Sequence, residues 1–190
     1  PSRRSIEYIY GEIMNGFFSQ GRGFNSQVVD TAQILTHMTR TLWEETKSKM
    51  LPTPSKFHYV FNLRDLSRIF EGIANASPEV VNESRILIKL WKHECDRVLK
   101  DRFNDDQDRQ WYENMVHETM SRYFDERTIT RTIGEETLFC HFLREPELGG
   151  ESQSIDVGAD HNEEDEAFDI DEYLASIPRV YEPVNSISSL

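Results

Sequence analysis

Two prolines, Pro52 and Pro54, constrain the fold more than any other feature of the sequence. Proline fixes its own φ and moves the residue before it out of the α-helical region, so the segment that holds both is extended. A long helical pattern ends at Met50, just before them, and the aromatic run 57–61 that follows is too short for a stable helix. Asn62 then suits the cap of a new helix, because its side-chain oxygen can accept an otherwise unpaired backbone N–H.

The helix expected after Asn62 has two different faces. Its apolar positions recur at about 100° per residue and predict one buried stripe, made of Leu63, Leu66, Phe70 and Ile73. Arg64 and Arg68 lie on the opposite side, one turn apart. Two interpretations stay open from spacing alone. One is a solvated cationic face paired locally with Asp65 and Glu71, and the other is an anion site, since planar guanidinium groups suit phosphate.

Further apolar periodicity predicts helices on both sides of this segment, at about 5–18, 26–50, 83–103 and 105–124. In the first of them the expected buried stripe is narrow, made of Ile6, Ile9, Ile13 and Phe17 and widened by Tyr10. Asn25 or Ser26 is expected to cap the second helix. Ser77 and Pro78 are expected to restart a helix before residue 83, with Ser as the cap and Pro at the first helical position. The chain is therefore expected to be mainly α-helical.

The pattern changes after Asp125, where the runs 128–133 and 138–143 are short and β-prone. We therefore expect an extended connector over 126–150. Residues 151–172 hold ten of the 34 acidic residues and no Lys or Arg, so we expect a disordered acidic linker that cannot bury enough apolar surface to offset its ordering entropy. The remaining acidic and basic residues nearly balance, which argues against a nucleic-acid partner. Hydrophobic residues return over 173–190.

No set of catalytic residues is recognisable in the sequence. It has no GxxxxGK[ST] loop and no supported Ser-His-Asp arrangement, so we expect no catalysis from this chain alone. The neighbours 93–96 (His, Glu, Cys, Asp) point in different directions on a helix and are not expected to bind a metal. Cys95 and Cys140 form no CxxC pair and are expected to be free thiols. No apolar run of about 18 residues is present, so no membrane span is expected.

The run LPTPSKFHYVFNLRDLSRIFEGI (51–73) resembles the small, or lid, subdomain of the third AAA+ module of dynein heavy chains, closer to the axonemal type. LIKLWKHECDRVLKDRF (87–103) resembles the next lid segment. The resemblance covers residues 1–125 well and the end near RVYEPV (179–184) more loosely, and it does not cover the acidic segment. It implies a helical AAA+ lid over 1–125, with 173–190 leading into the fourth module. Because the chain starts at Pro1 without an initiator Met, we expect a piece cut from a longer protein.

The same resemblance implies a function for the arginine face. Arg64 matches the sensor-2 position, where it would reach the γ-phosphate of ATP, and Arg68 would lie beside it. ATP or ADP would be the cofactor, with Mg²⁺ supplied through the large subdomain absent from this sequence. The lid would close over a regulatory site and pass its nucleotide state round the ring of a microtubule motor ATPase.

The implied partners are the neighbouring AAA+ modules and, through the parent chain, microtubules and dynein intermediate and light chains. The implied location is the cytoskeleton of the cytoplasm, in the axoneme of a cilium or flagellum. A different class of function stays open from the residues alone: a non-enzymatic α-helical module for protein–protein interaction, whose acidic tail recruits basic partners. A GxxxxGK[ST] loop upstream in the full-length chain would separate the two.

Overall fold

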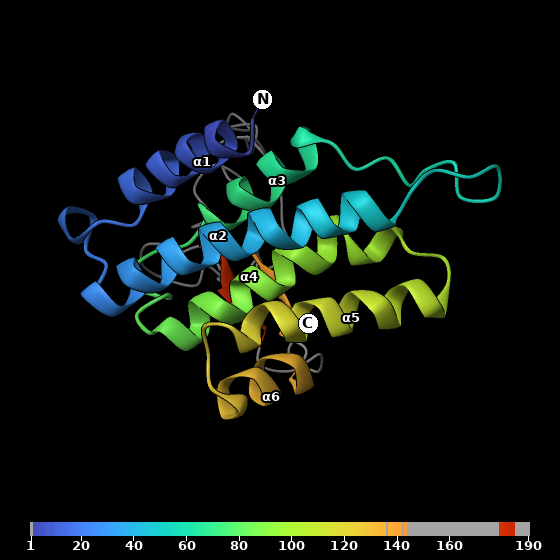
Figure 1. The fold of residues 1–190 in the computed structure, drawn as a ribbon. Coiled ribbons are helices and arrows are strands. Elements are labelled where there is room, and N and C mark those ends of the chain that lie inside the picture. The colour runs from blue at the N-terminus through green and yellow to red at the C-terminus, as the bar shows by residue number, and fades with distance from the viewer. Residues whose placement is uncertain (1, 136, 142, 144–178, 185–190) are drawn as a thin grey trace, which may run out of the picture.

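The computed structural model describes residues 2–135, 137–141, 143 and 179–184 of the 190-residue chain, and these residues form a helical bundle (Figure 1). The expected acidic linker, 151–172, lies outside the described residues. The α-helices are α1 (Arg3–Phe17), α2 (Ser26–Lys49), α3 (Leu63–Ile73), α4 (Ser84–Val98), α5 (Asp106–Ser121) and α6 (Glu126–Gly134). Two short 3₁₀ helices are η1 (Gln20–Arg22) and η2 (Lys100–Arg102).

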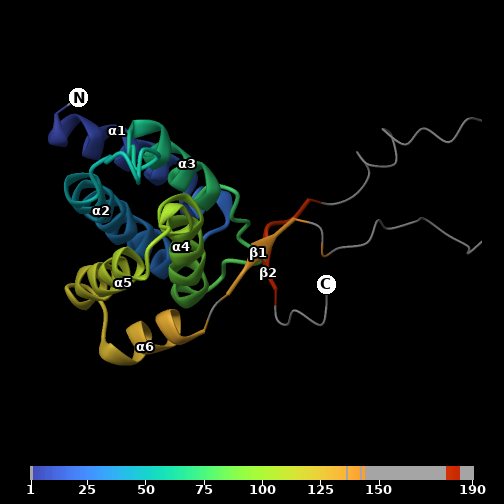
Figure 2. The ribbon, with the colours of Figure 1, turned by 90° about the vertical axis from the view of Figure 1, so that its right-hand side faces the viewer.

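Helices α2 and α4 pack between α1 and α3 on one side and α5 and α6 on the other (Figures 1 and 2). The core lies along the α2–α4 contact, where Leu35, Met38 and Trp91 are almost fully buried. The Trp91 indole Nε1 donates to Thr39 Oγ1 at 2.9 Å, so its polar atom has a partner inside the core. The mainly helical fold expected from the sequence is confirmed. Within the described part of the chain, no helix is both long and apolar enough to cross a bilayer.

A two-stranded antiparallel sheet lies at the side of the bundle (Figure 2). Strand β1 (Phe139–Cys140) pairs with β2 (Glu182–Pro183), with Phe139 opposite Pro183 and Cys140 opposite Glu182. The Val184 N–H extends the pairing by donating to the Leu138 carbonyl oxygen at 2.8 Å. The extended structure expected within 138–143 is therefore present. It is joined to a segment about 40 residues later in the chain.

The extended connector expected over 126–150 is wrong for its first part, because Glu126–Gly134 forms α6. Its β-branched residues favour strands, yet Ile129 and Thr132 lie on one helical face and are buried. The Thr132 hydroxyl donates to the Thr128 carbonyl oxygen at 2.9 Å, which satisfies that buried polar atom within the helix. Packing against α4 and α5 thus overrides the local preference.

The apolar stripe expected for the first helix is also partly wrong. Ile9 and Ile13 are 50% and 52% exposed, while Met14 is buried beside Ile6. The helix is rotated so that the Tyr10 ring stacks on Phe70, with centroids 4.6 Å apart. Helix α1 packs mainly against α2, and this packing together with the Tyr10–Phe70 contact leaves Ile9 and Ile13 outside the core.

The helix expected to restart at Ser77 and Pro78 does not form there. The Val81 N–H donates to the Ser77 carbonyl oxygen at 2.8 Å in a turn, and α4 begins only at Ser84. At its other end α4 stops at Val98 and gives way to η2, short of residue 103.

Candidate functional site

The first turn of α3 is held in place by a capping box. Asn62 Oδ1 accepts the Arg64 N–H at 2.8 Å, and Asp65 Oδ2 accepts the Asn62 N–H at 2.8 Å. The Trp43 indole Nε1, from α2, donates to the Asn62 carbonyl oxygen at 3.1 Å. The cap predicted at Asn62 is therefore confirmed, and the start of the helix is fixed to a second helix as well.

Asp65 is the buried centre of this arrangement, with 2% of the residue exposed. Its second oxygen, Oδ1, accepts a hydrogen bond from Arg102 Nη2 in η2. Arg102 Nη1 also donates to the Val60 carbonyl oxygen at 3.2 Å, and its guanidinium lies over the Phe61 ring at 5.3 Å. Asp65, which one of the two open interpretations paired with the arginine face, is thus occupied by an arginine 37 residues further along the chain.

The extended segment after the prolines is anchored to the start of α5. Lys56 Nζ contacts Asp105 Oδ2 at 3.0 Å and Asp108 Oδ2 at 2.5 Å, and the Tyr59 hydroxyl donates to Asp108 Oδ2 at 2.8 Å. These hydrogen bonds raise the pKa of Lys56, so its ammonium stays charged. Hydrogen bonds from Lys56 and the Gln107 N–H lower the pKa of Asp105. The segment that leads into α3 is therefore fixed although it has no regular secondary structure.

Arg64 and Arg68 lie exposed on the outer side of α3, as the sequence predicted. Among the described residues, neither side chain makes an ion pair or a hydrogen bond, so local pairing with Asp65 or Glu71 is not observed. Arg64 stands in the first turn, where the partial positive charge of the helix end disfavours a cation. Its position therefore does not serve the stability of α3, and both guanidinium groups remain available to an anion from outside.

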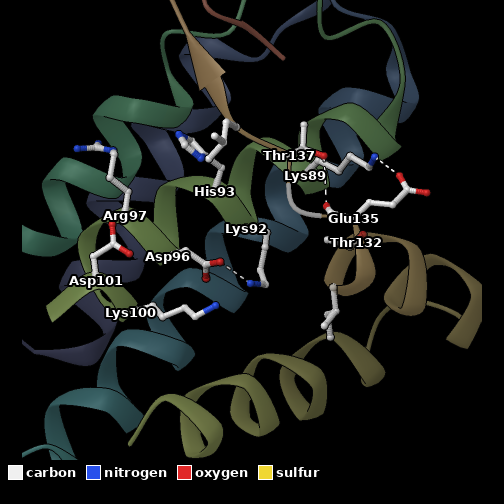
Figure 3. Close-up of a pocket in the computed structure, with 12 residues that line it drawn as sticks. Lys89, Lys92, His93, Asp96, Arg97, Lys100, Asp101, Thr132, Glu135 and Thr137 are labelled. Atoms are coloured by element: carbon white, nitrogen blue, oxygen red, sulfur yellow. Dashed lines mark hydrogen bonds and ion pairs between the residues drawn. The ribbon is translucent and has the colours of Figure 1, made fainter. Parts of the chain in front are cut away.

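A cavity of about 280 Å³ lies elsewhere, between α4, η2, α6 and the segment after α6 (Figure 3). The lysines that line it already have acidic partners: Lys89 with Glu135 at 2.5 Å, Lys100 with Glu113 at 2.6 Å, and Lys92 with Asp96. No residue of α3 lines it. The cavity is therefore separate from the arginine face and offers little uncompensated positive charge to a phosphate.

The cysteines and the histidine considered in the sequence analysis lie in the packed part of the fold. Cys95 is buried, and burial raises its pKa far above the ordinary value, which makes the thiol unreactive. Cys140 is a half-buried free thiol in β1. His93 is half-buried beside Phe139, and burial lowers its pKa. Within the described ranges, no three His, Cys, Asp or Glu side chains gather at a metal-binding distance.

Sequence reasoning missed Arg102, the residue that fixes Asp65. Nothing in the local sequence marks it, because its partner lies on another element. The capping box offered the available signal: an acid three residues after an Asn cap is expected to turn back toward the helix start.

Comparison with known proteins gives two kinds of similarity. Residues 35–132 match the family described as AAA+ lid domain. The whole chain aligns with dynein axonemal heavy chain 5 of Rattus norvegicus at 41% identity, covering 5% of that protein, and with dynein axonemal heavy chain 8 of Homo sapiens at 37%, covering 4%. The dynein gamma chain of the flagellar outer arm of Chlamydomonas reinhardtii is 35% identical over 77% of this chain, which covers 4% of it. The chain thus spans about one-twentieth of these relatives.

Proposed function

The chain belongs to the AAA+ lid domain family, and on that premise we propose that it is the lid over a regulatory nucleotide site in a dynein heavy chain. Its nucleotide would be ATP or ADP. The large subdomain of the same module would supply most of the contacts, and Mg²⁺ would be held through it. The place of this lid in the ring, at the third module with the fourth following, rests on the resemblance of residues 51–73.

The observation that carries the proposal is the arginine face of α3. Arg64 and Arg68 are exposed and have no side-chain partner among the described residues, although acids are abundant in this chain. The helix that presents them is fixed by Asn62, Asp65 and Arg102. A guanidinium presented by a fixed helix can bind the terminal phosphate of ATP, and that phosphate is absent from ADP.

Arg64 is the residue that we assign to the γ-phosphate, and Arg68, one turn further from the cap, is the second contact. Closure of the lid would then depend on which nucleotide is bound, since only ATP offers the γ-phosphate. The closed lid would change its contacts with the next module, and so transmit the nucleotide state round the ring.

The partners and location follow from the same proposal. Neighbouring AAA+ modules of the same heavy chain would contact the lid directly. Microtubules and the intermediate and light chains would interact with other parts of the parent protein. The relatives are named for the axoneme and for the flagellar outer arm, so we place the parent in the axonemal cytoskeleton of a cilium or flagellum.

The test is the substitution Arg64→Gln in the heavy chain that contains this segment, with ATP and ADP affinities measured at this module. Loss of a charge-assisted hydrogen bond is expected to lower the preference for ATP over ADP roughly ten- to a hundredfold. Glu71→Gln, at an exposed position of the same helix, is the matched control and should leave the preference unchanged. Equal preference in Arg64→Gln and the unsubstituted protein would contradict the assignment.

A second measurement uses the 190-residue chain alone. Because Arg64 and Arg68 are two contacts out of the many that a nucleotide needs, calorimetry should detect weak ATP binding or none. Micromolar affinity in this chain would mean that the nucleotide site lies within it and that the lid assignment is wrong.

A further inference from the structure

A second buried carboxylate, Glu94 in α4, contacts three elements of the fold. Glu94 is 1% exposed. Its Oε2 accepts two hydrogen bonds from Arg97, from Nε at 3.0 Å and from Nη2 at 2.5 Å. Its Oε1 accepts a hydrogen bond from the Tyr181 hydroxyl at 2.5 Å, and Tyr181 directly precedes β2. A buried carboxylate needs all of these donors, because an unpaired charge away from water is costly.

The third element that Glu94 touches is α3. Gly72, near the end of α3, is buried against the Glu94 side chain. A Cβ added at Gly72 would lie 1.9 Å from Glu94 Oε2 and 2.2 Å from its Cδ. The Glu94 side chain therefore lies directly against the backbone of Gly72, and a side chain at position 72 would collide with it. Because Arg97 and Tyr181 hold the carboxylate, it cannot move aside freely.

Tyr181 is the residue that fixes β2 to the bundle. It is 6% exposed, and its ring lies among His93, Phe139 and His141, with centroids 6.3, 5.7 and 4.6 Å away. Burial, and then the hydrogen bond to Glu94, raises its pKa, so the hydroxyl remains a donor over the physiological range. Through this hydroxyl, the segment at β2 is hydrogen-bonded to a buried charged group of the bundle.

We propose that Glu94 couples the position of α3 to the attachment of β2. A shift of α3 against α4 would change how firmly β2 is held to the bundle. A displacement of α3 at Gly72 presses on the Glu94 carboxylate, which then loses its alignment with the Tyr181 hydroxyl and loosens the strand. Glu94 and Tyr181 are positioning residues here, and neither is expected to touch nucleotide. The inference rests on the proposed function, because α3 is the helix that carries Arg64 and Arg68.

The test is hydrogen exchange of the backbone amides at 180–182 and 184 in the 190-residue chain without nucleotide. Gly72→Ala should accelerate this exchange on the order of tenfold, as expected when a hydrogen bond to a charged group is lost. Gly16→Ala is the matched control: its added Cβ, on α1, meets nothing within 4 Å, so exchange at 180–182 and 184 should not change.

The path through Glu94 is tested by a double substitution. Glu94→Ala removes both the tie to Tyr181 and the atoms that a Cβ at Gly72 would meet. It should accelerate exchange on its own, and adding Gly72→Ala to it should produce no further acceleration. If Gly72→Ala had its full effect in the Glu94→Ala protein as well, coupling through Glu94 would be contradicted.

Tyr181→Phe covers the case in which Gly72→Ala does not fold. It removes one hydroxyl and keeps the ring, and it should accelerate the same amides about tenfold, whereas Tyr8→Phe, 70% exposed on α1, should not. Unchanged exchange in Tyr181→Phe would also overturn the proposal. These measurements use no nucleotide, so they do not depend on whether Arg64 binds phosphate. Conversely, a negative result for coupling through Glu94 would leave the outcome of the Arg64→Gln experiment unaffected.

Discussion

Asp65 and Glu94 are both almost fully buried carboxylates, and each is paired with an arginine, yet they connect different parts of the molecule. Asp65 serves the start of its own helix and receives Arg102 from η2. Glu94 takes its arginine from one turn further along the same helix and uses its other oxygen to bind Tyr181, 87 residues away. The first carboxylate fixes a surface within the bundle, and the second attaches a later segment to it. Burial and charge alone therefore do not reveal what a buried acid does; its partners do.

The largest effect is expected from removing the first carboxylate. Asp65→Ala leaves the Arg102 guanidinium without its partner and deletes half of the capping box, which should lower the free energy of unfolding by about 3–5 kcal/mol. Urea denaturation followed by tryptophan fluorescence measures this loss. Asp106→Ala removes an acid whose side chain is 96% exposed and which also pairs with an arginine, so it should change stability far less. Similar losses in both variants would show that the Asp65 pair behaves like a surface pair.

A smaller effect is expected at the second carboxylate. Tyr181→Phe leaves Glu94 Oε1 without its donor, which should reduce the free energy of unfolding by about 1–3 kcal/mol. Arg97 remains in place, so the loss should stay below that of Asp65→Ala in the same urea experiment. If Tyr181→Phe were the more damaging change, the strand would be part of the folding core and not an attachment to it.

The arginine face should contribute almost nothing to stability. Arg64→Gln and Arg68→Gln should each change the free energy of unfolding by no more than about 0.5 kcal/mol, because both side chains are exposed. For Arg64 the sign is expected to be neutral or slightly stabilising, since a cation is removed from the helix N-terminus. A marked drop in melting temperature for Arg64→Gln would make it a structural residue and would weaken the phosphate assignment.

The smallest effect is the pH dependence of stability that His93, the neighbour of Glu94, should cause. Burial lowers the pKa of the neighbouring His93 below its ordinary 6.5, against the opposing influence of Glu94, whose Oε1 lies 4.0 Å from His93 Nε2. The unfolded chain then binds the proton more readily than the folded one. Stability should therefore decline as the pH falls from 7 through 6.5 toward the lowered value. His93→Gln should flatten this part of the pH profile of the melting temperature.

The sequence predicted those features of α3 that depend on a single helix alone. Asn62 as a cap, the buried Leu66 and the exposed Arg64 follow from a single helix and its periodicity, and all three are found. Arg102 and Tyr181 could not be placed, because each acts on a carboxylate in another element. A one-dimensional pattern does not say which elements meet.

The errors have the same origin. In α6, the β-branched Ile129 and Thr132 have a local preference for strands. The segment is nevertheless helical, because a helix buries both residues against α4 and α5. In α1, Ile9 and Ile13 have the spacing of a buried stripe, but the packing of α1 against α2, with Tyr10 stacked on Phe70, leaves that side exposed. Both outcomes depend on a neighbouring helix, and neither could be read from the segment itself.

The hydrogen bond from Trp43 to the carbonyl oxygen of Asn62 also has an optical consequence. The indole is 3% exposed, lies 5.1 Å from the Lys47 ammonium, and is attached to the residue that begins α3. Indole emission responds to the polarity and charge around the ring, so any shift in the first turn of α3 would change the colour or intensity of this fluorophore. The chain therefore carries an intrinsic reporter at the base of its arginine face, and no label needs to be attached to watch that helix move.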